Sequence, residues 1–321
     1  MIKVNNLTKI YKTPQKKPGL TGLVKDIFKR EYKEILAVDN ISFEIAEGEL
    51  IGFLGPNGAG KTTTLKMLTG ILYPTSGNIN VLDYTPFDKK EAFLKQIAFI
   101  AGQKNQLLWD LPAFDSFNLN KEIYEIENKQ FNETLDKLTK LLDCQDLLSQ
   151  PVKTLSLGQR MKMELIGALT HQPKILFLDE PTIGLDVVAQ KTIRDFIVDY
   201  QKLYSATIIL TSHYMEDIKA LCKKVMIINK GKIIYNGQLD DLIKKYATRK
   251  TIEVIVDSFP DLRQLEKIDK NVKLEFPKLI FHIKREDIPK KISLITEKIK
   301  FSDLNIYEER VEDIIRKIFN K

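Results

Sequence analysis

The chain has 321 residues, of which 43% are hydrophobic and 29% are charged, so it can bury a core of one large domain or two medium ones and is not a disordered chain. Its net charge of +7 is modest and does not by itself indicate a nucleic-acid partner. No apolar run approaches the roughly 18 residues of a membrane helix, and residues 1–6 lack the apolar stretch of a signal peptide. We therefore expect a cytosolic chain that reaches a membrane only from its surface.

Two short strands are expected near the N-terminus, at 1–11 and 37–50, separated by an insertion at 12–36. Pro14, Pro18 and Gly19 predict a loop at its start. Apolar residues then recur at 20, 23, 24, 27 and 28 with basic residues between them, which is typical of an amphipathic helix with a basic face. Such a helix packs on its own domain or contacts a membrane surface or a membrane partner.

The strongest motif follows the second strand, where GPNGAGKT matches the P-loop pattern. Residues 49–54 predict a strand entering the loop, and residues 61–69 predict a helix leaving it. Glycines let backbone N–H groups turn toward phosphate oxygens, and the helix N-terminus adds positive potential. We expect Lys61 at the β- and γ-phosphates of ATP, Thr62 at Mg²⁺ and Thr63 at the α-phosphate. The complete expected loop is Gly55, Pro56, Asn57, Gly58, Ala59, Gly60, Lys61, Thr62 and Thr63.

The remaining elements predict an α/β domain over 1–247, with a mostly helical subdomain at 104–170. Short apolar runs at 174–180 and 206–212 indicate buried parallel strands, and 225–235 indicates a hairpin. From 248 to 321 we expect a small α+β appendage, with strands at 251–257 and 278–284 and helices at 287–300 and 307–319.

Two carboxylates end the first of these apolar runs. Asp179 and Glu180 follow four apolar residues, at the edge of a parallel sheet where ligands bind. Asp179 suits the Mg²⁺ shell, and Glu180 suits the general base that polarises the attacking water.

The order of motifs along residues 1–240 resembles the ATP-binding subunits of ABC transporters. After the P-loop come Gln103, then LSLGQR from Leu155, which is similar to the ABC signature, then Asp179 and Glu180, then Asp186 and finally His213. The resemblance implies a P-loop ABC-type ATPase domain, with a mixed-sheet core and a helical signature subdomain, that uses ATP and Mg²⁺.

The resemblance also assigns residue roles. Tyr11 matches the aromatic residue that stacks on adenine, and Gln103 matches the glutamine that senses Mg²⁺ and the membrane partner. His213 matches the switch histidine that holds the γ-phosphate and the base in line. Glu180, His213 and Lys61 therefore form the expected catalytic set. Ser156, Gly158 and Gln159 match the signature that contacts ATP held by a second subunit, and Asp186 matches the acid that crosses the dimer interface. These roles imply a head-to-tail dimer, expected to be a homodimer.

One residue departs from the family pattern, because Leu157 replaces the first glycine of the usual signature pair. The sequence around Leu157, together with LLWDLP from Leu107, resembles that of the bacterial exporters that include daunorubicin-resistance and viologen-export ATPases. This implies a transport-coupled ATPase at the cytoplasmic face of the membrane, under a polytopic membrane subunit. Trp109 is expected either in the docking surface for that subunit or in the core.

Other classes remain open at this stage. A soluble ABC-type ATPase acting on ribosomes or nucleic acid is the main alternative. However, the chain has one P-loop and no sustained heptads, so no nucleic-acid partner is expected. An importer ATPase also matches the motifs. A non-hydrolysing regulatory subunit is favoured only if Leu157 disables the site.

Overall fold

The computed structural model describes residues 1–15, 32–102, 104–212, 214–247, 249–258, 265, 268–269, 272–309 and 311–319. Contacts between Cα atoms divide the chain into two units, Met1–Gly237 and Gln238–Lys321. The expected boundary between domain and appendage lay ten residues later, at 247/248. None of the helices in the described ranges combines the length and apolar character needed to cross a bilayer.

The centre of the first unit is a six-stranded sheet with the order β5-β6-β7-β3-β8-β9. Its strands are β3 (Leu50–Leu54), β5 (Ile97–Ala101), β6 (Ile175–Asp179), β7 (Thr207–Thr211), β8 (Lys224–Asn229) and β9 (Lys232–Gln238). The neighbouring strands from β5 to β8 are parallel. Every residue of β3 and β7 is buried, which explains their continuous apolar sequence.

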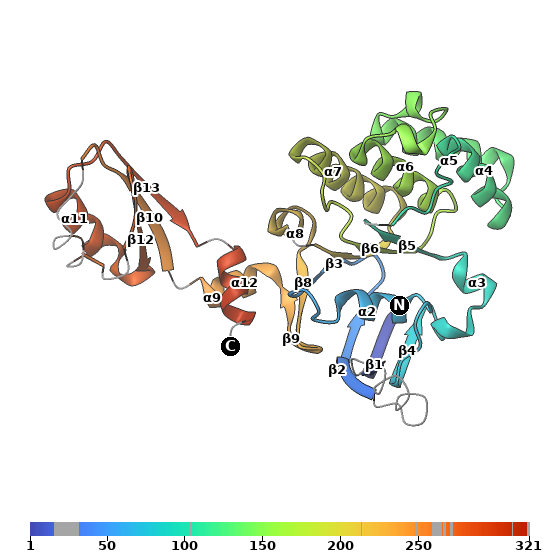
Figure 1. Ribbon diagram of the computed structural model, residues 1–321, viewed down its shortest axis with the longest axis horizontal. Helices are drawn as coiled ribbons and strands as arrows, with labels where there is room; N and C mark the ends of the chain where they lie inside the picture. The colour runs from blue at the N-terminus through green and yellow to red at the C-terminus, as the bar shows by residue number, and fades with distance from the viewer. Residues whose placement is uncertain are drawn as a thin grey trace, which may run out of the picture. The chain divides into compact units, whose positions relative to one another are not determined.

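A smaller antiparallel sheet has the order β2-β1-β4, formed by β1 (Ile2–Pro14), β2 (Tyr32–Ile45) and β4 (Ser76–Val81). It lies with α2 (Lys61–Leu68) on one side of the central sheet (Figure 1). One apolar cluster fills the space between them and includes Ile2, Val38, Phe53, Leu65 and Ile79.

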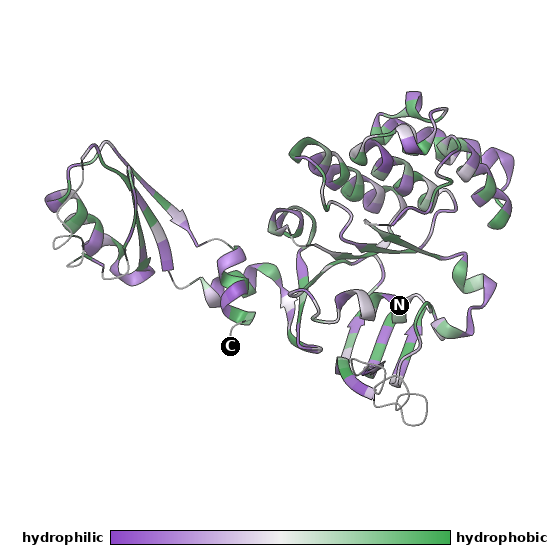
Figure 2. Cartoon of the chain, in the orientation of Figure 1, coloured by the Kyte–Doolittle hydropathy of each residue, from purple (hydrophilic) through white to green (hydrophobic). Residues whose placement is uncertain are grey.

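Helices cover the opposite side of the central sheet (Figure 1). They are α4 (Ala113–Ile123), α5 (Asn128–Leu142), α6 (Leu157–Leu169), α7 (Val187–Tyr204) and the shorter α8 (Met215–Leu221). The short α3 (Glu91–Leu94) lies on the side of α2 and β4, where its Phe93 joins the apolar cluster (Figure 1). The one-turn 3₁₀ helices are η1 (Pro86–Asp88), η2 (Gln145–Leu147) and η3 (Val152–Thr154). In Figure 2 the helices alternate between hydrophobic and hydrophilic residues, as expected for elements with one buried face.

The second unit is an antiparallel sheet with the order β11-β12-β10-β13. Its strands are β10 (Arg249–Ile255), β11 (Lys273–Glu275), β12 (Lys278–Lys284) and β13 (Asp303–Glu308), and its helices are α9 (Leu239–Tyr246), η4 (Arg285–Asp287), α11 (Ile288–Lys298) and α12 (Val311–Phe319). The unit has its own apolar core, which includes Ile252, Phe281 and Ile295. Helices α9 and α12 contact each other.

The α/β class with a mixed sheet and helices is confirmed, and two local predictions were wrong. Residues 12–14 and 32–36, expected in the insertion, extend the hairpin of β1 and β2, where Lys12 pairs with Glu34 at 3.3 Å. The amphipathic helix expected beyond them falls mainly on residues 16–31, outside the described residues. Residues 307–308, expected in a helix, end β13, because pairing with β10 overrides their local preference.

Candidate functional site

The carboxyl ends of three neighbouring strands, β6, β7 and β3, meet at one edge of the central sheet. The P-loop follows β3, Asp179 ends β6, and Thr211 ends β7 opposite Asp179. Ala101 at the end of β5 pairs with Asp179 from the other side. This is the edge at which parallel α/β sheets bind ligands.

The P-loop is shaped by glycines that no larger residue can replace at the same backbone position. A Cβ at Gly55 would lie 2.4 Å from the Ile228 oxygen, and one at Gly60 would lie 2.4 Å from the Ala37 oxygen. Gly60 precedes α2 with φ of +108°, a conformation that favours glycine. Gly58, also at positive φ, has no atom within 4 Å of a hypothetical Cβ, so this side of the loop faces open space. The loop therefore has room for a phosphate chain next to its backbone and the N-terminus of α2.

Lys61 lies inside the P-loop. Its side chain is 5% exposed, and its Nζ donates hydrogen bonds to the carbonyl oxygens of Gly55 at 2.6 Å and Pro56 at 3.2 Å. Burial lowers the pKa of Lys61 below its ordinary value, while the nearby carboxylates of Glu180 and Asp179 act in the opposite direction. The site thus combines a cation held at the loop with acids across from it.

A chain of hydrogen bonds joins the P-loop to the acidic end of β6. The Thr62 hydroxyl donates to Asp179 Oδ2 at 2.8 Å, and the Thr211 hydroxyl donates to Asp179 Oδ1 at 2.7 Å. The paired oxygens of Thr62 and Asp179 are hard donors of the kind that Mg²⁺ prefers, so these residues fit the expected ion. Thr211 is a site residue that its local sequence does not single out, although its position at a strand end beside Ser212 is a usable signal.

Glu180 has an unusual backbone conformation, with φ of +57°. Its N–H donates to the Thr211 carbonyl at 3.1 Å and contacts the Thr211 hydroxyl at 3.0 Å. A Cβ at Gly102 would lie 2.1 Å from the Glu180 oxygen, so the residue that follows β5 must lack a side chain. Strain of this kind is often concentrated at functional sites. A cavity of about 400 Å³ lies here, lined among others by Asn57, Thr62, Asp179 and Glu180.

The signature residues begin α6. Ser156 is its N-cap in a capping box, in which Ser156 Oγ accepts from Gln159 N–H at 3.3 Å and Gln159 Oε1 accepts from Ser156 N–H at 2.9 Å. Gly158 lies against α7, because a Cβ there would be 3.1 Å from the Ala189 Cβ. Leu157 is 37% exposed, and its Cδ2 lies 3.2 Å from the place of a Cβ at Gly184.

Four further expected residues are not part of this hydrogen-bonded edge: two lie elsewhere in the fold and two lie outside the described residues. Asp186 is the exposed N-cap of α7 and accepts a hydrogen bond from Ala189 N–H at 2.8 Å. Tyr11 lies in β1 with a ring that is 37% exposed and has Lys9 Nζ at 5.4 Å from its centroid. Gln103 and His213 lie outside the described residues.

Comparisons with known proteins identify the family of the chain. Residues 38–183 match the family described as "ABC transporter". The chain is 33% identical to "ABC transporter ATP-binding protein NatA" of Bacillus subtilis, over 67% of this chain and 87% of that protein. It is 31% identical to "Linearmycin resistance ATP-binding protein LnrL" of the same species, over 71% and 73% of the two chains. Among solved structures, a dimeric post-hydrolysis state of the ATP-binding cassette MJ0796 with ADP and Pi has a TM-score of 0.61 at 21% identity, over 74% of this chain and 99% of that one.

Proposed function

The chain belongs to the family of ABC transporter ATP-binding proteins, and from this premise we propose that it is the ATPase subunit of an exporter. ATP hydrolysis is the characteristic activity of the family, and the chain is an ATPase of this kind. The observation that carries the proposal is the 2.8 Å hydrogen bond between Thr62 and Asp179, because it joins the phosphate-binding loop to the acidic strand end.

Four residues at this edge would share the chemistry. Lys61 would bind the β- and γ-phosphates, since its ammonium already lies within the loop. Thr62 and Asp179 would hold Mg²⁺, which when bound neutralises charge on the phosphates. Glu180 would accept a proton from the attacking water. Gln103 and His213, which match the family's Mg²⁺-sensing and switch positions, are proposed to complete the site.

The rest of the nucleotide would be bound from two directions. The exposed ring of Tyr11 is available for adenine, although the Lys9 ammonium lies over the same ring. The remaining P-loop residues would bind phosphate through their backbone N–H groups.

A second copy of the chain would cover the ATP with its signature. Ser156 and Gln159 cap α6 at its exposed start, and Asp186 is exposed at the start of α7. Beside Asp186, Val187 and Val188 are 73% and 76% exposed, which is unusual for apolar side chains and supports a protein contact there. We propose a head-to-tail homodimer in which these residues and Gly158 face the partner's nucleotide.

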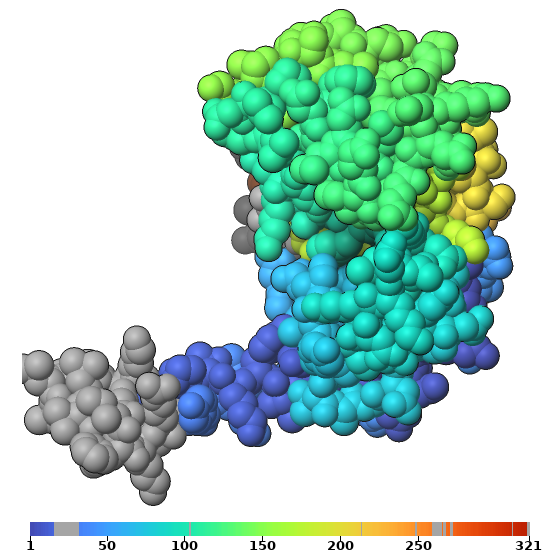
Figure 3. Space-filling model, turned by 90° about the vertical axis from the view of Figure 1, so that its right-hand side faces the viewer, coloured from blue at the N-terminus to red at the C-terminus, as the bar shows by residue number. Residues whose placement is uncertain are grey.

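A polytopic membrane subunit is the second proposed partner. A cleft of about 380 Å³ lies between the helices and residues 69–99, on the face drawn in Figure 3. Directly after Leu107, which lines the cleft, the apolar residues Leu108, Trp109, Leu111 and Phe114 are 39–45% exposed. This exposure favours docking for Trp109 over a place in the core. The location would be the cytoplasmic face of the membrane, and the word "resistance" in the name of LnrL supports export.

Affinity purification of the protein from native membranes, followed by mass spectrometry, tests the partner. Recovery of a polytopic membrane protein in about equal amount is expected, and Trp109→Ala should abolish it without changing the melting temperature. Tyr73→Ala is the control, because Tyr73 is another exposed aromatic residue, at 59%. Recovery of ribosomal or DNA-bound proteins alone would favour a soluble ATPase instead.

The direction of transport needs a separate measurement. If the protein powers an exporter, cells that carry only a hydrolysis-deficient variant should accumulate more of a drug to which they have become sensitive. An importer role predicts less accumulation of the cargo in the same cells.

A further inference from the structure

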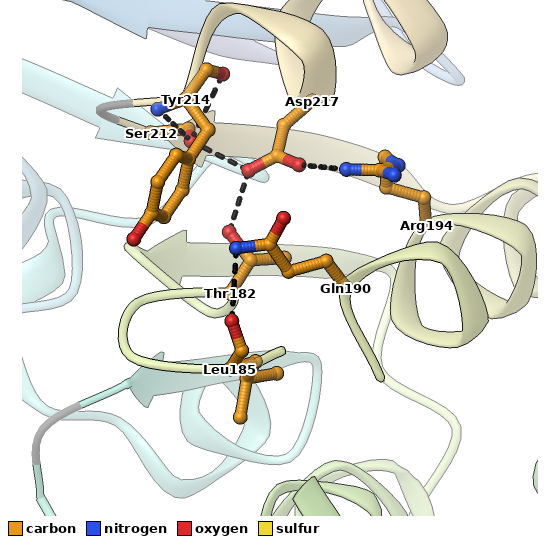
Figure 4. A network of polar contacts seen from close by, with 7 residues as sticks. All are labelled: Thr182, Leu185, Gln190, Arg194, Ser212, Tyr214 and Asp217. Atoms are coloured by element: carbon orange, nitrogen blue, oxygen red, sulfur yellow. Dashed lines mark hydrogen bonds and ion pairs between the residues drawn. The ribbon is translucent and has the colours of Figure 1, made fainter. Parts of the chain in front are cut away.

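Asp217 of α8 is a fully buried carboxylate that binds three other segments of the chain (Figure 4). Its Oδ2 accepts hydrogen bonds from the hydroxyls of Thr182 at 2.5 Å and Ser212 at 2.6 Å. Its Oδ1 accepts from the guanidinium of Arg194 at 2.8 Å, in an ion pair whose side chains are 0% and 12% exposed. Both carboxylate oxygens are therefore occupied within the protein.

Two of the three segments carry proposed catalytic residues, and the third is α7. Thr182 lies two residues beyond Glu180. Ser212 immediately precedes His213, and its hydroxyl also accepts from Tyr214 N–H at 2.9 Å, so the residues on both sides of His213 are held by one side chain. Arg194 lies on α7, which begins after Asp186. A single carboxylate thus connects the loop after β6, the segment around His213 and α7.

This arrangement is costly if its only purpose is stability. A buried carboxylate loses its hydration, and a buried ion pair often gives no more stability than apolar residues of similar size would. By contrast, the arrangement fixes the distance between segments that must act on the same water and phosphate, and small misplacements of such groups slow a reaction strongly.

We propose that Asp217 is a positioning residue for ATP hydrolysis, which acts by holding the segments of Glu180 and His213 in register through Thr182 and Ser212. The inference rests on the proposed function. Among the described residues, the Asp217 carboxylate accepts hydrogen bonds from Thr182, Ser212 and Arg194 and from no P-loop side chain. Lys61 and Thr62 instead donate to Gly55, Pro56 and Asp179. Removal of the Asp217 carboxylate is therefore expected to slow ATP hydrolysis without weakening the binding of ATP.

Two double variants of the full chain test the proposal. Asp217→Ala with Arg194→Met removes both buried charges and the acceptor for the two hydroxyls. Asp217→Asn with Arg194→Met removes the same charges, but the amide oxygen can still accept from Thr182 and Ser212. Neither pair leaves an unpaired buried charge, so both are expected to fold, which circular dichroism and thermal melting will check.

The measured quantities are kcat for ATP hydrolysis and the dissociation constant of ATP. We expect the alanine pair to lose roughly 10²-fold in kcat, with the ATP dissociation constant unchanged, and the asparagine pair to stay close to wild type. Glu49→Gln is the matched control. It breaks the 3.1 Å ion pair with Lys224 at the amino ends of the parallel strands β3 and β8, the ends away from the P-loop. This change should lower the melting temperature but not kcat.

The possible outcomes distinguish the positioning role of Asp217 from the proposed ATPase function. Equal kcat values in the two double variants, or a loss of ATP affinity in parallel with kcat, would overturn the positioning role while leaving the proposed function intact. A wild-type protein that binds ATP without hydrolysing it would overturn the proposed function and the positioning role together.

Discussion

The carboxyl edge of the central sheet and the sheet of the C-terminal unit differ in what they bury. At the first, Lys61, Thr182, Thr211, Ser212 and Asp217 are all at most 5% exposed. In the second, the described core is apolar, and ion pairs such as Arg285 with Glu308 lie at the surface. Because buried polar groups cost free energy, this set beside the P-loop marks a part of the molecule under chemical constraint.

The largest expected effect is on the rate of ATP hydrolysis, and it tests the carboxyl edge of the central sheet at Glu180. Glu180→Gln keeps the shape of the side chain but removes the base, so steady-state ATP hydrolysis should fall roughly 10²–10⁴-fold while ATP binding persists. Glu216→Gln, at an exposed position of α8, is the control and should hydrolyse ATP normally. Normal turnover in the Glu180 variant would exclude it as the base.

A substitution in the core of the C-terminal unit is expected to have an effect of similar size, but on stability and not on ATP hydrolysis. Phe281 is fully buried in β12, so Phe281→Ala should cost about 3–5 kcal/mol of stability in that unit. ATP affinity should be unchanged, because the residues proposed to bind nucleotide all lie in Met1–Gly237. Thermal unfolding with limited proteolysis will separate the units, and Leu274→Ala, at a 38% exposed position, is the control. Loss of ATP binding together with the C-terminal unit would show that the two units are coupled.

A smaller effect is expected at Lys61. Replacing it with Met removes charge-assisted hydrogen bonds to phosphate, each worth about 1.5–3 kcal/mol. The ATP dissociation constant, measured by equilibrium binding, should therefore rise roughly 10- to 100-fold. Lys129→Met, on the exposed face of α5, should bind ATP as wild type does. An unchanged affinity in the Lys61 variant would place the phosphates elsewhere.

Sequence reasoning succeeded where a local pattern determines the geometry. The apolar strand before Gly55, the positive-φ glycines and the helix after Lys61 are all properties of neighbouring residues, and the structure contains each of them. The turn at Lys230 and Gly231 between β8 and β9 is of the same kind, with φ of +48° and +79°.

The interactions that sequence reasoning missed join distant segments. Thr211 contacts Asp179 from 32 residues away, and Asp217 contacts Thr182 from 35 residues away. Neither pairing has a periodicity or spacing that a single sequence reveals, since each depends on which strands become neighbours in the sheet. The extension of β1 and β2 beyond residues 11 and 37 likewise depends on pairing between the two strands, such as Tyr11 with Ile35.

The smallest expected effect is at the surface of the C-terminal unit, where Glu308 accepts from both Arg285 and Lys250. Arg285→Gln should lower the free energy of unfolding by about 0–1 kcal/mol, less at high salt, because exposed ion pairs gain little in water. Lys250, by its hydrogen bond, lowers the pKa of Glu308 below its ordinary value. The stabilisation is therefore present above the pKa of the unfolded carboxyl group, and it is lost as pH falls through the lowered folded value.

Urea unfolding of the wild type and Arg285→Gln at neutral and acidic pH measures this contribution, and the difference between them should shrink in acid. ATP hydrolysis by the variant should equal that of the wild type. A variant with normal stability but slower hydrolysis would break the comparison at its weakest point, because a charge in the water-exposed part of one unit would then act on chemistry in the other. In that case the C-terminal unit would be a regulatory element of the ATPase, and its ion pairs would matter for their position and not for their small contribution to stability.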